Sequence, residues 1–259
     1  FFIFLIVLIS FTWMMMRHFN IQYESLYEDV INFIKKIFNI YMPRRSKVAV
    51  IFDLDETIGH FYQIGKIWEG LKFFEEDKFK NKEFFKLLDM FPFVFRPKIF
   101  DVFRYLRDQK KKDSSIRVII YSNNTGPPKW ANLIKKYIEK KIDYKLFDKV
   151  ITAWKVNGVI LEPCRSTNEK TYEEILKCGN LNENMELFFV DDAYHPKMFH
   201  DNVDYMHIKE YRFAYEIGDM IEKYLNSDNC KKLSKKSLIE IRGKLPEYVK
   251  RLNWGRVRY

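Results

Sequence analysis

Two aspartates separated by one residue, Asp53 and Asp55, directly follow an apolar run at residues 48–52. In an extended chain, side chains at positions i and i+2 lie on the same side of the backbone. Two carboxylates held this close repel each other, and both are driven toward protonation unless a cation compensates their charge. Taken alone, such a pair is more often a solvated loop or a helix cap, so its meaning depends on what lies beside it.

Two further apolar runs also end in polar side chains. Residues 118–121 run into Ser122, and residues 187–190 run into Asp191 and Asp192. Carboxylate oxygens are the hard ligands that Mg²⁺ takes in proteins. We therefore expect Mg²⁺ as the cofactor. Its predicted ligands are Asp53, Asp55, Asp191 and Asp192.

The three runs that precede these side chains are β-branched or aromatic on both faces, as in fully buried strands. Helical patterns lie between and beside them, over residues 99–111, 128–141 and 168–177. Alternating buried strands and helices predict an α/β fold with a parallel sheet. Ligands of such sheets bind outside the carboxyl ends of the strands, and all three polar stops fall at that edge.

This order of residues resembles the four motifs of the haloacid dehalogenase (HAD) superfamily of phosphotransferases. In chain order, the matching residues are Asp53, Asp55, Thr57, Ser122, Lys170, Asp191 and Asp192. The form Asp-Leu-Asp-Glu-Thr, followed by Gly59 and His60, is similar to the branch that dephosphorylates the C-terminal domain of RNA polymerase, also called NLI-interacting-factor-like. Phe95-Arg96-Pro97 is a further match to that branch.

The resemblance implies a HAD-like Rossmannoid parallel sheet flanked by helices, with small insertions in place of a large cap. Residues 58–93 suit a short flap with one or two helices, which is too small to enclose a metabolite. Residues 150–164 read as a hairpin with a turn at Asn157-Gly158. An open site of this kind favours a macromolecular phosphoester as substrate.

The resemblance also implies a role for each motif residue. Asp53 would attack phosphorus to form an aspartyl-phosphate, and Asp55 would act as general acid and then general base. Lys155 and Lys177 are alternatives to Lys170, and His195 is interpreted as structural. The residues expected to bind the substrate phosphate are Thr57, Ser122, Asn123 and Lys170, with Thr57 also positioning the nucleophile loop.

Three functions compete on these grounds. The first is a Mg²⁺-dependent protein Ser/Thr phosphatase, with a phosphorylated protein or peptide as partner. The second is a polynucleotide 3′-phosphatase, because the pair Ser122-Asn123 departs from the branch and is seen in DNA-end phosphatases. The third is a catalytically silent, membrane-tethered binding protein of the same fold, against which the complete set of four aspartates argues.

The net charge of the 259-residue chain is +10, and its 47% of apolar residues exclude a disordered chain. Residues 226–259 hold ten basic and three acidic residues, which describes a basic tail rather than a basic protein. This tail is expected to contact nucleic acid or an acidic protein. Its apolar residues are spaced for a helix, and Gly243 and Pro246 predict an interruption that leaves two short helices.

Residues 1–16 carry no charge, but a membrane-spanning helix needs roughly 17 to 25 apolar residues. A remnant of a membrane anchor, a cleaved signal peptide and an artefact of the start site all remain open. Residues 17–46 are expected to form a helical linker, residues 47–225 the phosphatase domain, and residues 226–259 the basic helical tail.

The three cysteines, Cys164, Cys178 and Cys230, form no Cys-x-x-Cys pair. This spacing predicts neither a zinc site nor a disulfide framework. A sparse, odd set of cysteines favours a reducing compartment, and with it a cytoplasmic or nuclear location, with a membrane tether left open.

Overall fold

A five-stranded parallel sheet forms the centre of the computed structural model, which describes residues 28–36, 47–75, 80–126, 129–230 and 233–251. The strands lie in the order β3-β2-β1-β6-β7, and each pairs in parallel with its neighbours. Their bounds are β1 Val48–Phe52, β2 Arg117–Tyr121, β3 Lys149–Ile151, β6 Glu186–Asp191 and β7 Val203–His207. The predicted α/β fold with a parallel sheet is confirmed.

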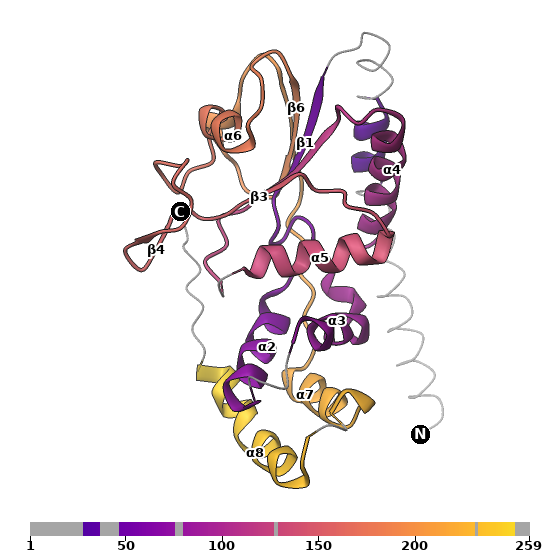
Figure 1. Ribbon diagram of the computed structural model, residues 1–259, viewed down its shortest axis with the longest axis vertical. Coiled ribbons are helices and arrows are strands. Elements are labelled where there is room, and N and C mark those ends of the chain that lie inside the picture. The colour runs from indigo at the N-terminus through magenta and orange to yellow at the C-terminus, as the bar shows by residue number, and fades with distance from the viewer. Residues whose placement is uncertain (1–27, 37–46, 76–79, 127–128, 231–232, 252–259) are drawn as a thin grey trace, which may run out of the picture.

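Helices cover both faces of this sheet (Figure 1). Ala49 and Ile51 of β1 pack with α6 (Tyr172–Gly179) on one face. The alternate residues of the same strand pack on the other face with α4 (Ile99–Lys112), α5 (Trp130–Ile142) and a helix at residues 28–36. Both faces are therefore buried, as the unbroken apolar character of the strands predicts.

The predicted helices over residues 99–111 and 128–141 correspond to α4 and α5. The helix predicted over residues 168–177 starts later, at Tyr172, so Lys170 precedes it. Thr171 explains this start, because its side-chain oxygen accepts a hydrogen bond from the backbone N–H of Glu174 and so caps the first turn.

Beyond the carboxyl edge of the sheet lies a group of helices drawn from two distant parts of the chain (Figure 1). The insertion after β1 contributes two helices, as expected, and the C-terminal part contributes the others. These helices are α2 Tyr62–Glu75, α3 Asn81–Met90, α7 Ile217–Leu225 and α8 Lys235–Arg251. Short 3-10 helices lie at η3 Pro92–Val94, η4 Pro196–Met198 and η5 Asp228–Cys230.

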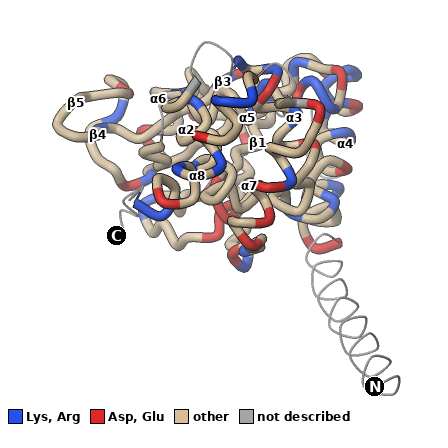
Figure 2. The backbone as a smooth tube through the Cα atoms, turned by 90° about the horizontal axis from the view of Figure 1, so that it is seen from below, with Lys and Arg blue, Asp and Glu red and all other residues tan. Residues whose placement is uncertain are grey.

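The predicted hairpin is present as β4 (Lys155–Val156) and β5 (Val159–Ile160), and it projects from one side of the molecule (Figure 2). Gly158 in its turn has a φ of 85°, a backbone conformation that glycine adopts at little cost.

The prediction of two short helices in the basic tail is wrong. A single helix, α8, runs through Gly243 and Pro246. Ile241, Leu245 and Val249 are buried, and the helix packs against α2 and α7. This packing outweighs the helix-breaking tendency of the two interrupting residues, since most helical stability in proteins comes from burial of an apolar face.

Among the described residues, no helix has both the length and the apolar character needed to cross a membrane. Residues 1–16, for which an anchor was weighed, lie outside the described residues, as does most of the predicted linker at 17–46. The described part of that linker, residues 28–36, contributes Val30, Ile31 and Ile34 to the main core.

Candidate active site

The carboxyl ends of β1 and β6 bring three aspartates together. The backbone N–H of Asp53 donates to the carbonyl oxygen of Val190 at 2.9 Å, which continues the pairing of the two strands past the end of β1. Asp191 is the last residue of β6 and Asp192 follows it. One carboxylate oxygen from each of Asp53, Asp191 and Asp192 lies within 4.8 Å of the others.

Lys170 reaches this cluster from the loop before α6. Its ammonium group forms ion pairs with Asp53 and, at 2.6 Å, with Asp191. The side chain is only 2% exposed. Burial acts to lower the pKa of Lys170, but the charges of Asp191 and Asp53 outweigh it and raise the pKa, so this lysine stays charged.

Asp55 lies beside the cluster and accepts a hydrogen bond from the side-chain amide of Asn124 at 2.6 Å. Burial raises the pKa of Asp55 to about 7, although the bond from Asn124 acts in the opposite direction. Burial also raises the pKa of Asp53 well above its ordinary value. The pKa of Asp55 therefore suits proton transfer near neutral pH.

Thr57 is bonded to Asp192 rather than placed in the cavity. Its hydroxyl donates to the Asp192 carboxylate at 2.7 Å and accepts from the Asp192 backbone N–H at 3.0 Å. The residue is 1% exposed. This position supports the expected role of Thr57 in holding the nucleophile loop. Its expected contact with the substrate phosphate has no support in these contacts.

A cavity of about 440 Å³ lies over these carboxylates. Ser122 and Asn123, which follow β2, both line it, as expected for phosphate-binding residues. Its rim includes the exposed residues Glu210 and Arg212. Lys170, Asp53, Asp55, Asp191 and Asp192 also line the cavity, so the predicted site residues other than Thr57 share one space.

The loop after β1 is fixed by Arg96, whose role the sequence did not reveal. Its guanidinium donates to the carbonyl oxygens of Thr57 at 2.6 Å and Glu56 at 2.7 Å. Glu56 has a φ of 58°, in the left-handed region that most side chains avoid. Arg96 thus stabilises a strained loop next to Asp53 and Asp55. The motif Phe95-Arg96-Pro97 marked this residue, but only the fold shows what it contacts.

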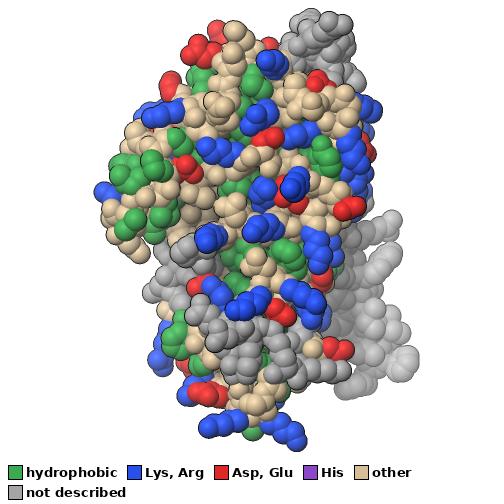
Figure 3. Space-filling view, in the orientation of Figure 1, with side chains coloured by type: hydrophobic (Ala, Val, Ile, Leu, Met, Phe, Trp, Pro, Cys, Tyr) green, Lys and Arg blue, Asp and Glu red, His purple; other side chains and the backbone are tan. Residues whose placement is uncertain are grey.

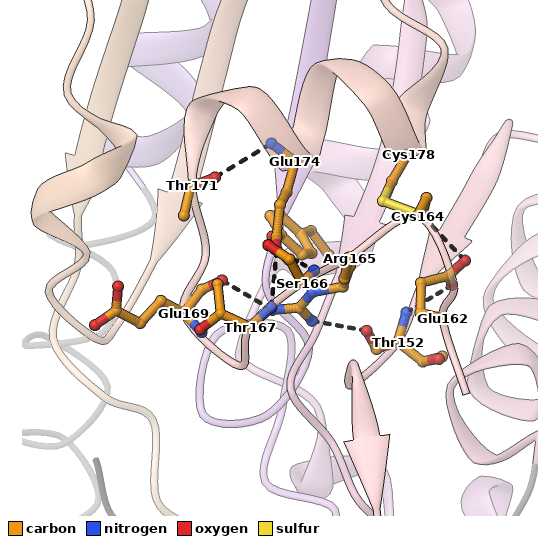
Figure 4. Close-up of a disulfide and its surroundings, with 11 residues drawn as sticks. Thr152, Glu162, Cys164, Arg165, Ser166, Thr167, Glu169, Thr171, Glu174 and Cys178 are labelled. Carbon is orange, nitrogen blue, oxygen red and sulfur yellow. Dashed lines mark hydrogen bonds and ion pairs between the residues drawn. A yellow bond between two sulfur atoms is a disulfide. The ribbon is translucent and has the colours of Figure 1, made fainter. Parts of the chain in front are cut away.

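The prediction of no disulfide framework is wrong. Cys164 and Cys178 form a disulfide that ties the segment after the hairpin to α6 (Figure 4). Their Cα atoms lie 5.3 Å apart, within the range that a disulfide spans. The capped turn at Thr171 folds the chain back on itself, which the spacing of the two cysteines alone does not show. Cys230 is buried and is not part of a disulfide.

The donor set fits a hard divalent cation. Four aspartates, Asp53, Asp55, Asp191 and Asp192, line the cavity together with one ammonium group, that of Lys170. Burial raises the pKa of Asp192 to about 6, with a further contribution from the charge of Asp191. A cation bound to the three clustered carboxylates would relieve this repulsion, and all of the candidate ligand atoms are oxygens, as Mg²⁺ prefers.

Comparisons with known proteins leave the family open. No family model matches the sequence, and no curated protein matches it. Among solved structures, the chain is similar to a hydrolase of the HAD superfamily, subfamily IA, variant 1, from Geobacter sulfurreducens PCA, with a TM-score of 0.30 and 14% identity over 57% of this chain and 80% of that chain. The neighbour belongs to the superfamily that the motifs resemble, but the overlap is too loose to support an argument, and nothing in it points to the RNA polymerase branch.

Proposed function

We propose that this protein is a phosphomonoester hydrolase of the HAD type that acts through an aspartyl-phosphate. The observation that carries the proposal is the arrangement of Asp53, Lys170 and Asp191 in one buried ion-pair network, with Asp55 alongside. A nucleophile, a phosphate-binding cation and a proton donor then line a single cavity.

In the first step, a carboxylate oxygen of Asp53 forms a bond to phosphorus while the ester bond to the leaving oxygen breaks. Asp55 gives its proton to that leaving oxygen, which its pKa of about 7 supports. Lys170 and Ser122 hold the phosphoryl oxygens and stabilise the charge that develops on them.

In the second step, Asp55, now ionised, takes a proton from a water molecule. The oxygen of that water forms a bond to phosphorus, and the bond between phosphorus and Asp53 breaks. Inorganic phosphate leaves and both aspartates return to their starting states. Asn124 keeps the carboxyl of Asp55 oriented through both steps by its 2.6 Å hydrogen bond.

Asp53, Asp191 and Asp192 would hold Mg²⁺, which supplies charge neutralisation for the phosphoryl oxygens. The backbone carbonyl of Asp55 is a further candidate ligand. The three carboxylates would be its main anchors because their oxygens already converge.

A protein phosphoserine or phosphothreonine is the substrate that we favour. The insertion after β1 contributes two helices, α2 and α3, to the group beyond the carboxyl edge of the sheet (Figure 1). The cavity has exposed side chains, Glu210 and Arg212, on its rim. Such a rim leaves room for a phosphorylated side chain that is attached to an extended peptide.

Phosphate release from a phosphopeptide and from a 3′-phosphorylated oligonucleotide, each with Mg²⁺, tests this proposal. We expect release from the peptide at a higher kcat/KM than from the oligonucleotide. Asp53→Asn should abolish release, because an amide is a poor nucleophile for phosphorus. Asp201→Asn removes an exposed carboxylate outside the cavity and serves as the matched control, with unchanged activity.

Release from the oligonucleotide alone would replace the peptide substrate with a nucleic-acid end and keep the chemistry. Binding of the phosphopeptide without any turnover of either ester would instead identify a silent binding protein.

A further inference from the structure

The loop that carries Lys170 is held by the buried carboxylate of Glu174, a residue in the first turn of α6. One oxygen of Glu174 accepts from the backbone N–H groups of Ser166 at 2.7 Å and Thr167 at 3.1 Å, and from the Ser166 hydroxyl at 3.1 Å. The other oxygen accepts from Arg165 and Tyr121. The carboxylate of Glu174 therefore joins residues 166 and 167, where the loop begins, to the first turn of α6, where the loop ends (Figure 4).

Arg165 extends this hold to the residue next to Lys170. Its side chain is fully buried and pairs with Glu174 at 3.1 Å. The same guanidinium donates to the carbonyl oxygen of Glu169 at 3.0 Å and to that of Thr152 at 2.7 Å. Arg165, the ion-pair partner of Glu174, therefore holds the carbonyl group of the peptide bond that joins Glu169 to Lys170.

Tyr121 connects the Glu174 carboxylate to the end of β2, where Ser122 is proposed to bind the phosphate. Its hydroxyl donates to Glu174 at 3.0 Å, and the next residue along the chain is Ser122. The Lys170 ammonium lies 5.6 Å from the centre of the Tyr121 ring. Glu174 consequently contacts Arg165, which holds the residue before Lys170, and Tyr121, the residue before Ser122. It does not line the cavity itself.

The disulfide between Cys164 and Cys178 joins the two ends of the segment that contains Arg165, Lys170 and Glu174. Cys164 precedes Arg165, and Cys178 lies one turn after Glu174 on α6. The chain between the two cysteines contains Lys170, so its ends are covalently joined.

The geometry points to Glu174 as a positioning residue for Lys170, which fixes the ammonium group where it meets the phosphoryl oxygens. This inference rests on the proposed function for its kinetic consequence, but the placement of Lys170 itself can be measured without any turnover. Glutamine at position 174 would have no negative charge to pair with Arg165. Its amide N–H group would also face the N–H donors that the Glu174 carboxylate now accepts from, so the loop before Lys170 would lose these hydrogen bonds.

Glu174→Gln is the variant that tests this inference. Loss of one well-placed charged hydrogen bond to the phosphoryl group corresponds to about tenfold or more in affinity. We expect the KM for the phosphoester and the dissociation constant for inorganic phosphate, measured with Mg²⁺, to rise by about that factor, and kcat to fall by less. Glu173→Gln is the matched control, since Glu173 is an exposed neighbour in the same turn, and it should change neither value.

A readout independent of activity follows from the burial of Lys170. A lysine-acylating reagent with peptide mass spectrometry should leave Lys170 unmodified in the native chain and in Glu173→Gln, and should modify it in Glu174→Gln. If Glu174→Gln does not fold, Arg165→Lys replaces it, because lysine keeps the charge but cannot reach both Glu169 and Thr152.

Unchanged acylation of Lys170, or a fall in kcat with KM and phosphate affinity unchanged, would overturn the inference, because a merely structural residue changes only the fraction of active protein. If no phosphoester is turned over by the native chain while Lys170 becomes exposed only in Glu174→Gln, the positioning role stands and the proposed function fails.

Discussion

At the scale of single residues, the carboxyl of Asp55 is set to keep its proton. Burial raises its pKa from 3.8 to about 7, against the hydrogen bond from Asn124 and with help from the charge of Glu56. The folded protein therefore binds this proton more tightly than the unfolded chain does. The resulting contribution to stability is fully present below pH 3.8 and is lost as the pH rises through about 7.

In protein freed of divalent cations, we expect the melting temperature to fall between about pH 4 and about pH 7. Asp55→Asn should show a smaller fall, because asparagine has the same shape but no charge to desolvate. Asp53 and Asp192, whose pKa values burial also raises, will preserve part of the slope. Thermal unfolding followed by circular dichroism measures it, with Asp201→Asn as control. Identical slopes for the native chain and Asp55→Asn would contradict this account.

At the scale of elements, α8 is held by a close approach to α2 at Gly70. A Cβ atom at Gly70 would lie 2.3 Å from Cδ1 of Leu245 and 3.2 Å from a ring carbon of Tyr248. The absence of a side chain at Gly70 lets the two helices meet. By contrast, a Cβ atom at Gly243 in α8 would meet nothing within 4 Å.

The two glycines consequently respond to alanine in opposite ways. Gly70→Ala should lower the free energy of unfolding by up to about 2 kcal/mol, because overpacking costs about 1–3 kcal/mol and alanine regains about 1 kcal/mol in a helix interior. Gly243→Ala should raise it by about 1 kcal/mol, because alanine favours a helix interior. Urea denaturation measures both values, and a loss of stability in Gly243→Ala as large as in Gly70→Ala would refute the explanation.

The disulfide has its own effect on stability, because it closes a short loop between residues 14 positions apart. Cys164→Ser should lower the free energy of unfolding by about 3 kcal/mol. A dithiol reductant should lower the stability of the native chain by a similar amount and leave that of Cys164→Ser unchanged. A reductant that destabilises the variant equally would show that another part of the molecule responds.

The central elements were predictable from the sequence because their signals are local. The runs before Asp53, Ser122 and Asp191 are short and apolar on both faces, which is typical of buried strands in a parallel sheet. The edge strands β3 and β7 were missed, since Lys149 in β3 and the polar residues Asp204 and His207 in β7 break the apolar pattern.

The sequence marked the side chains that the fold brings to one cavity, apart from Thr57, but it did not reveal the residues that hold them in place. Arg96 contacts Glu56 across 40 positions of the chain, Asn124 contacts Asp55 across 69, and Glu174 contacts Ser166 across 8. Their residue types carry no sign of such contacts. The Cys164–Cys178 pair is similar, because it depends on how the capped loop before α6 folds back.

At the scale of the whole molecule, part of the excess positive charge lies on α8, a helix that is packed against the rest of the structure. Residues 226–259 carry ten basic and three acidic residues, and α8, which holds many of them, covers α2 and α7 with its apolar face. Lys and Arg also lie across the face shown in Figure 3. The contact of this segment with nucleic acid or an acidic protein stays a prediction, and the cavity itself is lined by acidic groups.

The central claim is that Asp53 carries the phosphoryl group during turnover. The most direct measurement mixes the full chain with Mg²⁺ and para-nitrophenyl phosphate, quenches with acid, and analyses the peptide containing Asp53 by mass spectrometry. We predict a mass increase of one phosphoryl group on Asp53. In Asp53→Asn, both this mass increase and turnover should be absent. Turnover that persists in Asp53→Asn, or a phosphoryl group found on another residue while Asp53 is unmodified, would contradict the account.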